Sequence, residues 1–395
     1  MSPHPRGPVA PTLVLLALAS GAFAIGASQA GAGGIEIEQA KDLGTSVDLV
    51  GYSISAYALG VVVSAPLLTI LLARWDRRKI LLAMMAIAVV FNAATALAPG
   101  VGALIAIRFF SAIPHGVFLA AGSVVGAHVV GAKRRGRAMA VMMTGFTVAI
   151  IAAVPMMKWV AATYDWRWTY LGVSAASAIA LALVFAVVPS VPAVGPSHWR
   201  TDLAHLRQRK VAGAILFCGL GFAGFGVVFT YVVPILQELD KLSVNAVTVV
   251  LSASGVAMTV GTIIAGKITD LSPVLSAKVG AVLSVAGLVA LGLGGAVPAI
   301  AIAIVLLVNG AAALMSQGAQ THFMDVIHAS PMLGAAMAHA SLNVANAIGA
   351  AVGAAIIGAH LGYLTTAWVA VGFTVIGIGI LAWGPGFRRA GAALA

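Results

Sequence analysis

Long apolar runs separated by short polar segments make up nearly the whole chain. A membrane-spanning helix needs about 20 mostly apolar residues, so the pattern predicts about twelve spans. The runs are continuous, whereas the strands of a membrane β-barrel alternate apolar and polar residues over short segments. We therefore expect an all-α polytopic membrane protein. The expected spans lie near residues 11–34, 47–73, 79–98, 102–129, 137–161, 168–190, 210–236, 244–269, 275–294, 297–320, 333–359 and 363–384.

The first run follows a short basic N-terminus, an arrangement that also occurs in secretory signal peptides. Its length, and the many similar runs after it, favour an uncleaved first span.

The segment 71–82, LLARWDRRKILL, places four cations between the second and third runs. Short loops rich in Lys and Arg stay on the cytoplasmic side of a membrane. With this loop inside, the loops predicted outside carry few basic residues. We expect a multi-pass protein of the inner or plasma membrane with both termini cytoplasmic. The basic residues expected outside are Lys41, Arg167 and Lys241.

A polar connection near residues 189–209 contains prolines and charges, and it divides the spans into two sets of six. This division predicts an N-terminal bundle over 1–190, a cytoplasmic linker over 191–209 and a C-terminal bundle over 210–395. Two such bundles indicate an internal repeat of the kind that supports alternating access in transporters.

The composition agrees with a membrane protein and excludes several other classes. Hydrophobic residues make up 61% of the chain and charged residues 8%, whereas soluble domains carry about 25% charged residues. Lys and Arg exceed Asp and Glu by 22 to 11, but no aromatic and basic interleaving suggests nucleic-acid binding. A single cysteine, Cys218, permits no disulfide within the chain. Without a phosphate-binding loop or metal-ligand spacing, we expect no enzyme, cofactor or metal.

The segment 71–82 resembles the signature G-x-L-x-D-R-x-G-R-R of the major facilitator superfamily. Aligned on Arg74, Arg77 and Arg78, the signature is incomplete. Thr69 and Asp76 replace its two glycines. Ala73 replaces its acid.

A second resemblance lies at the matching place in the other half, where GKITD contains Gly266 and Asp270. Together these motifs resemble the twelve-span drug and solute:proton antiporters, which include arabinose-type, purine and chloramphenicol exporters. That resemblance implies two six-helix bundles, a small-molecule substrate, protons as the coupling ion, and a monomer in the lipid bilayer. Other segments that resemble these exporters are YALG at 57–60, PHG at 114–116, Gly145 with Val154-Pro155, WRWTY at 166–170, TYVVP at 230–234 and Asn343 with Asn346.

Arg108 is the most informative candidate site residue. A guanidinium at membrane depth costs about 3 kcal/mol or more and usually faces a cavity or a partner. It could attach anionic or carbonyl groups, or belong to a proton relay; the alternative is a structural arginine bonded to backbone carbonyls. His115 lies two helical turns on, and its imidazole could carry a proton or be packed in its neutral form.

Polar and aromatic residues of other spans are further cavity candidates. His339, Asn343 and Asn346 recur at helical spacing, although hydrogen bonds between helices would select the same pattern. The aromatic candidates are Phe225, Phe229 and Tyr231 in the seventh span and Tyr52 in the second, with packing or lipid contact as the alternative.

The sequence does not indicate which single group would carry the proton. Gln29 stands where related exporters often carry an acid in the first span, and an amide cannot exchange a proton. Proton coupling would then use His115, His339, Glu36 or Asp48. In the fifth span Pro155 predicts a kink, because proline removes a helical hydrogen bond.

The resemblance implies an inner latch, which is a contact between the two halves on the cytoplasmic side. The motif residues predict that this latch is weaker than in the family, or displaced. Because Ala73 replaces the family's acid, Asp76 would pair instead with Arg77, Arg78 or the end of the eleventh span. Gly266 and Asp270 keep their places in the second half.

These patterns predict a secondary active exporter of small organic or drug-like solutes that exchanges them for protons by alternating access. An uncoupled facilitator or an importer of sugars or nucleosides is the alternative that the missing acid at Gln29 favours. A non-transporting membrane sensor on the same fold is the alternative that the incomplete loop signature favours.

Overall fold

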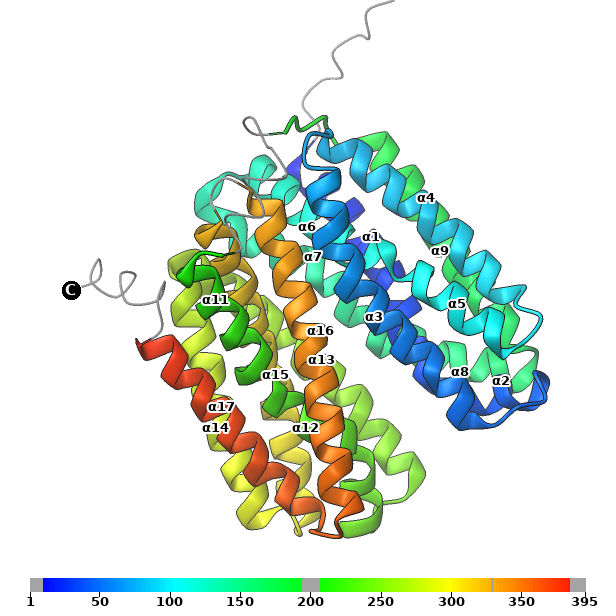
Figure 1. The fold of residues 1–395 in the computed structure, drawn as a ribbon, viewed down its shortest axis with the longest axis vertical. Coiled ribbons are helices and arrows are strands. Elements are labelled where there is room, and N and C mark those ends of the chain that lie inside the picture. The colour runs from blue at the N-terminus through cyan, green and yellow to red at the C-terminus, as the bar shows by residue number, and fades with distance from the viewer. Residues whose placement is uncertain (1–9, 194–206, 328–329, 384–395) are drawn as a thin grey trace, which may run out of the picture. The chain divides into compact units, whose positions relative to one another are not determined.

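The computed structural model describes residues 10–193, 207–327 and 330–383 (Figure 1). Over these residues the chain is almost entirely helical and contains no strand. Twelve helical segments within the described part are long and apolar enough to cross a membrane. The predicted all-α architecture and the number of spans are confirmed, and the chain is a multi-pass membrane protein.

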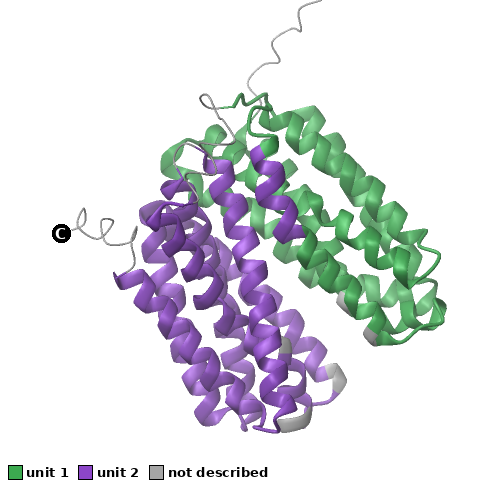
Figure 2. Cartoon of the chain, in the orientation of Figure 1, with its two compact units in different colours: residues 1–60, 71–196 green, residues 61–70, 197–395 purple. Residues whose placement is uncertain are grey.

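The contacts between residues divide the chain into two compact units (Figure 2). Unit 1 contains residues 1–60 and 71–196, and unit 2 contains residues 61–70 and 197–395. Residues 61–70, in the C-terminal half of the second span, therefore group with unit 2.

Unit 1 consists of the first six spans apart from that piece. Its first span ends earlier than the sequence pattern predicts, at Ala30, because three of the next four residues are glycines, which disfavour an α-helix. The helices are α1 (Pro11–Ala30), η1 (Gly31–Gly34), α2 (Glu36–Asp42), α3 (Val47–Leu71), α4 (Arg77–Ala96), α5 (Val101–Ser111), α6 (Ile113–Val130), η2 (Ala132–Arg134), α7 (Arg135–Val148), η3 (Ala149–Ala153), α8 (Val154–Thr163) and α9 (Trp166–Val187).

Two spans of unit 1 depart from regular α-helix. The fourth span breaks at Ala112 into α5 and α6, and Pro114 lies in the first turn of α6. The fifth span contains the π-helical turn η3 directly before α8, where Pro155 occupies the first turn. The first turn tolerates proline because its N–H has no partner within the helix. The irregular backbone therefore lies at the place where Pro155 predicted a kink.

Small residues bring the helices of unit 1 into backbone contact. A Cβ atom added to Gly145 of α7 would lie 1.9 Å from the carbonyl oxygen of Ala19 in α1. Such close approach is how membrane helices pack when the lipid offers them no hydrophobic driving force. A separate buried cluster joins α5 to α9 through Leu104, Trp166 and Tyr170.

Unit 2 contains the other six spans. Its seventh span carries two π-helical turns, and its other spans are continuous helices over the described residues. The helices are α11 (Arg209–Leu216), η4 (Phe217–Gly221), α12 (Ala223–Pro234), η5 (Ile235–Leu239), α13 (Val244–Leu271), α14 (Pro273–Gly294), α15 (Pro298–Val326), α16 (Pro331–Gly358) and α17 (Tyr363–Trp383).

Candidate functional site

Arg108 lies in the last turn of α5, and its side chain has no exposed surface. Its Nη1 donates to the hydroxyl oxygens of Ser28 on α1, at 3.3 Å, and Ser111, at 3.5 Å. A cation at this end of a helix is stabilised by the helix dipole. The break after α5 thus places Arg108 in the last turn of a helix instead of in the middle of a continuous one.

Aromatic rings cover the guanidinium of Arg108. Its Cζ atom lies 4.4 Å from the ring centre of Tyr57 on α3 and 5.6 Å from that of Tyr170 on α9. A desolvated cation over an aromatic face gains about 2 kcal/mol. The Tyr57 hydroxyl lies 3.3 Å from Nδ1 of His115 on α6. Tyr57 therefore contacts both the imidazole of His115, through its hydroxyl, and the guanidinium of Arg108, through its ring.

Part of this cluster has unused hydrogen-bonding capacity. The Nε and Nη2 atoms of Arg108 and the hydroxyl of Tyr170 have no hydrogen-bond partner among the described residues. Within the same residues, no carboxylate pairs with Arg108. Nε and Nη2 form one edge of the guanidinium, and such an edge binds a carboxylate in a bidentate way. We call Ser28, Tyr57, Asn92, Arg108, Ser111, His115 and Tyr170 the guanidinium cluster.

The sequence identified Arg108 and His115 in this cluster but missed most of the neutral members. Ser28, which contacts Arg108, precedes the predicted Gln29 by one residue. The Ser28 hydroxyl donates to Asn92 Oδ1 at 2.8 Å, and Asn92 donates to the carbonyl of Ala88 at 2.7 Å. An asparagine inside the apolar run 79–98 is the signal that could have identified it. Gln29 itself is half-buried, and its Oε1 has no hydrogen-bond partner.

A second polar cluster lies in unit 2, between α15 and α16. Nε2 of the buried His339 lies 3.0 Å from Nε2 of Gln320, and Asn343 donates to the carbonyl of His339 at 2.9 Å. Gln317 is also buried, and neither atom of its amide has a hydrogen-bond partner. Asn346, predicted to share this face, is exposed. The sequence thus found His339 and Asn343 but missed both glutamines.

The aromatic candidates are dispersed. Phe225 and Phe229 stack with ring centres 5.0 Å apart and line a small apolar hollow within unit 2. Tyr231 lies against Gly353 of α16, where any added Cβ would lie 2.4 Å from its ring. Tyr52 is 60% exposed and makes no part of the guanidinium cluster.

Two acids outside the spans that the structure describes have raised pKa values. Glu36, in the first turn of α2, is half-buried, and this burial raises the pKa of its carboxyl, while Lys158 opposes the rise. Asp240 follows η5; burial raises its pKa too, and neither carboxylate oxygen has a hydrogen-bond partner. The side chain of Asp48 is not among those described. Asp240 is a candidate proton carrier that the sequence pattern did not single out.

Asp42, at the end of α2, fastens this helix to α9. Its carboxylate accepts hydrogen bonds from Arg167 and, at 3.1 Å, from Nε1 of Trp166. The hydrogen bond from Arg167 is the larger cause that lowers the pKa of Asp42, and that from Trp166 is the next. A carboxyl with a lowered pKa stabilises the folded state above its unfolded pKa of about 3.9 and loses this effect as the pH falls through the folded value.

Replacing Asp42 with asparagine should therefore lower the melting temperature at pH 7 and leave it unchanged near pH 3. The loss corresponds to at most about 1 kcal/mol, because the pair is exposed. Thermal unfolding of both proteins in detergent at pH 7, 5 and 3 measures the difference. Glu38→Gln, which removes a charge from α2 but no described ion pair, is the control. A difference that is independent of pH would contradict the assignment.

The loop before α4 is held within unit 1. Oδ1 of Asp76 accepts the backbone N–H groups of Arg78 and Lys79 and so caps α4, and Oδ2 accepts the Ser190 hydroxyl at 2.6 Å. Arg77 is buried and donates to two carbonyls of its own loop.

The structure gives the position of each motif residue within its own unit. A latch between the two halves stays a prediction. Arg74 is exposed at the same loop. In unit 2, Gly266 is buried in α13, and Asp270 lies in the last turn of that helix.

Known proteins resemble this chain over most of its length. Residues 18–338 match the profile of the Major Facilitator Superfamily. The inner membrane transport protein YdhP of Escherichia coli (strain K12) is 34% identical over 355 residues, which cover 88% of this chain and 90% of that protein. The chloramphenicol resistance protein of Streptomyces lividans is 29% identical over 366 residues, covering 90% and 92%. The solved structure of the proton:xylose symporter XylE superposes with a TM-score of 0.77 at 16% identity, covering 94% and 95%.

Proposed function

The chain belongs to the Major Facilitator Superfamily and is a membrane transporter, and from this we propose that it exports small organic or drug-like solutes in exchange for protons. The proposal includes a monomer with both termini cytoplasmic and six-span bundles over 1–190 and 210–395, joined by the linker 191–209. We expect no enzymatic activity.

The guanidinium cluster is the observation that carries this proposal. Arg108 is fully buried, has a free hydrogen-bonding edge and has no carboxylate partner in the described part. Such an arginine lowers the stability of the fold, so a purely structural role does not explain it. The aromatic faces of Tyr57 and Tyr170 add an apolar wall. Such a site suits an amphipathic solute that presents an anionic or carbonyl group.

Export of a drug-like solute is supported by the relative named for chloramphenicol resistance. The likeness to a proton:xylose symporter concerns the fold alone, because only 16% of residues are identical. We therefore place export ahead of an uncoupled facilitator, a sugar or nucleoside importer, or a non-transporting sensor.

Reconstitution of the purified protein into liposomes tests this function, with chloramphenicol as the probe solute. An imposed pH gradient should drive uptake into vesicles whose lumen is acidic, and a protonophore should abolish it. If chloramphenicol and a panel of amphipathic drugs move in neither direction, the exporter proposal is wrong.

We expect the group that couples transport to protons to be Glu36 or Asp240, two acids near the ends of the spans that are half-buried or buried. Their raised pKa values mean that Glu36 and Asp240 hold a proton to a higher pH than ordinary carboxyls. We expect Glu36→Gln or Asp240→Asn to lose uptake driven by the pH gradient, and to keep exchange of labelled for unlabelled solute.

The same assay on His115→Gln and His339→Gln tests the two imidazoles, and Glu38→Gln is the matched control. Coupling through these acids is excluded if both acid variants accumulate solute as the wild type does. Loss of coupling in a histidine variant alone would assign the proton to that imidazole.

A further inference from the structure

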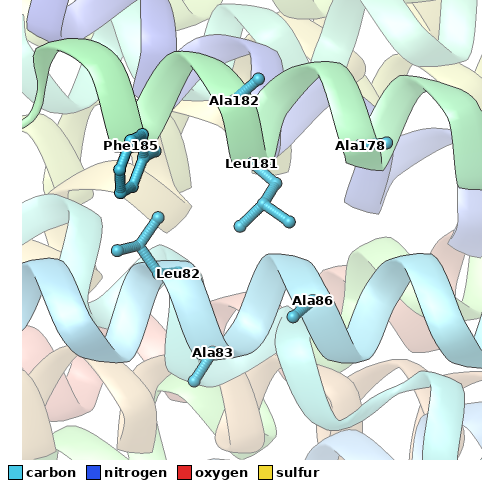
Figure 3. A pocket seen from close by; sticks show the side chains of 7 residues that line it. All are labelled: Leu82, Ala83, Ala86, Ala178, Leu181, Ala182 and Phe185. Atoms are coloured by element: carbon cyan, nitrogen blue, oxygen red, sulfur yellow. The ribbon is translucent and has the colours of Figure 1, made fainter.

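A slot opens between α4 and α9 on the surface of unit 1 (Figure 3). It is an open hollow of about 590 Å³ and is lined only by apolar side chains. Figure 3 shows Leu82, Leu181 and Phe185 pointing into the space between the two helices. Small side chains leave this space open. The α4–α9 slot is lined by Leu82, Ala83, Ala86, Ala178, Leu181, Ala182 and Phe185.

Two hydrogen bonds between the helices frame the slot. At one end the Ser174 hydroxyl of α9 donates to the carbonyl of Val89 at 2.8 Å. At the other end Nη2 of Arg78 donates to the carbonyl of Phe185 at 2.5 Å. The lining residues of α9 run from Ala178 to Phe185, seven residue steps that rise about 10 Å along the helix. One leaflet of a bilayer has a hydrocarbon depth of about 15 Å, so the slot covers about two thirds of one leaflet and begins near the end of a span.

The Arg78 end of the slot is strongly basic. Four cations of the segment 71–82 lie there, and the same segment carries one carboxylate, Asp76; the cations are Arg74, Arg77, Arg78 and Lys79. That carboxylate already accepts the N–H groups that cap α4 and a serine hydroxyl. An anionic group would therefore be attracted to this end, as basic residues at a membrane surface attract anionic lipids.

The side chains at this end also suit the membrane interface. Trp75 is 49% exposed, and tryptophan is enriched where membrane meets water. The guanidinium of Arg78 lies 5.5 Å from the ring centre of Phe185, so the cation and the apolar lining meet at one point.

We propose that the α4–α9 slot binds the acyl chain of a phospholipid whose anionic headgroup lies against Arg78 and Lys79. The apolar lining fits a hydrocarbon tail and offers no hydrogen bond to a polar solute. The slot lies within the depth of one leaflet, and the charge at its Arg78 end selects the headgroup. This site is separate from the guanidinium cluster and does not depend on the proposed transport function.

Photoreactive lipids test the site on the full-length protein in phosphatidylcholine nanodiscs. Phosphatidylglycerol or phosphatidylcholine with a diazirine in the tail is cross-linked, and the labelled residues are identified by mass spectrometry. We expect label on the slot residues, about fivefold more from phosphatidylglycerol, as one cation near the membrane surface predicts. Arg78→Gln should remove this preference, and Ala182→Phe, which fills the slot, should remove slot labelling by both lipids.

Matched variants control for charge and bulk elsewhere. Arg134→Gln removes an exposed cation from η2, and Ala290→Phe adds a ring to an exposed position of α14; both should label as the wild type does. Competition on the wild type, where excess unlabelled phosphatidylglycerol displaces the probe better than phosphatidylcholine, needs no variant to fold. Label spread evenly over the exposed helices, or equal competition by both lipids, would overturn the proposal.

Discussion

Arg108→Ala should reduce transport by about 100-fold, because a charged group that binds the solute through two hydrogen bonds contributes about 3 kcal/mol. The protein should still fold, since the variant removes a buried cation that has no carboxylate partner in the described part of the chain. Initial rates of solute uptake into liposomes, with gel filtration and melting temperature alongside, measure both effects.

Arg108→Lys separates charge from geometry. Lysine keeps the positive charge but lacks the planar edge formed by Nε and Nη2. We expect only partial recovery of transport. Arg134→Ala, at an exposed position of η2, is the control and should transport normally. Full activity of Arg108→Ala would remove the guanidinium cluster from the transport site.

Gly145→Val should prevent accumulation of folded protein. The Cβ atom alone would lie 1.9 Å from the carbonyl oxygen of Ala19, a backbone atom that no side-chain rotation can move, so α7 would have to move away from α1. Overpacking usually costs about 1–3 kcal/mol, and a backbone clash of this depth exceeds that range.

Gly172→Ala in α9 is the matched control, since an added Cβ there meets no atom within 4 Å. Size-exclusion chromatography of the two variants after membrane extraction compares them. A monodisperse Gly145→Val protein would show that α1 and α7 can separate without loss of the fold.

The number of spans followed from the sequence because hydropathy alone decides whether a segment enters a membrane. Arg108 followed for a related reason, since a cation within an apolar run is conspicuous. Ser28 and Gln317 did not, because a neutral polar side chain within a span can serve helix packing as well as a binding site. Which helix faces which neighbour depends on packing, so the sequence did not indicate that Ser28 would contact Arg108.

Asp76 shows that a motif position does not by itself fix the role of a residue. The family resemblance led us to expect a gating role for this acid. In the structure both of its oxygens are engaged within unit 1, with the first turn of α4 and with Ser190. An N-cap is a local role that aspartate fills in any helix, so a motif position alone does not distinguish capping from gating.

The π-helical turns have a consequence for comparing this chain with its relatives. A π turn accommodates one extra residue within a helix, and one residue corresponds to about 100° of rotation. The side chains of α8 therefore point about 100° away from the directions that a wheel drawn through α7 would give them. For any relative that lacks this turn, an alignment without a gap across Ala149–Ala153 would pair lipid-facing residues of one protein with inward-facing residues of the other.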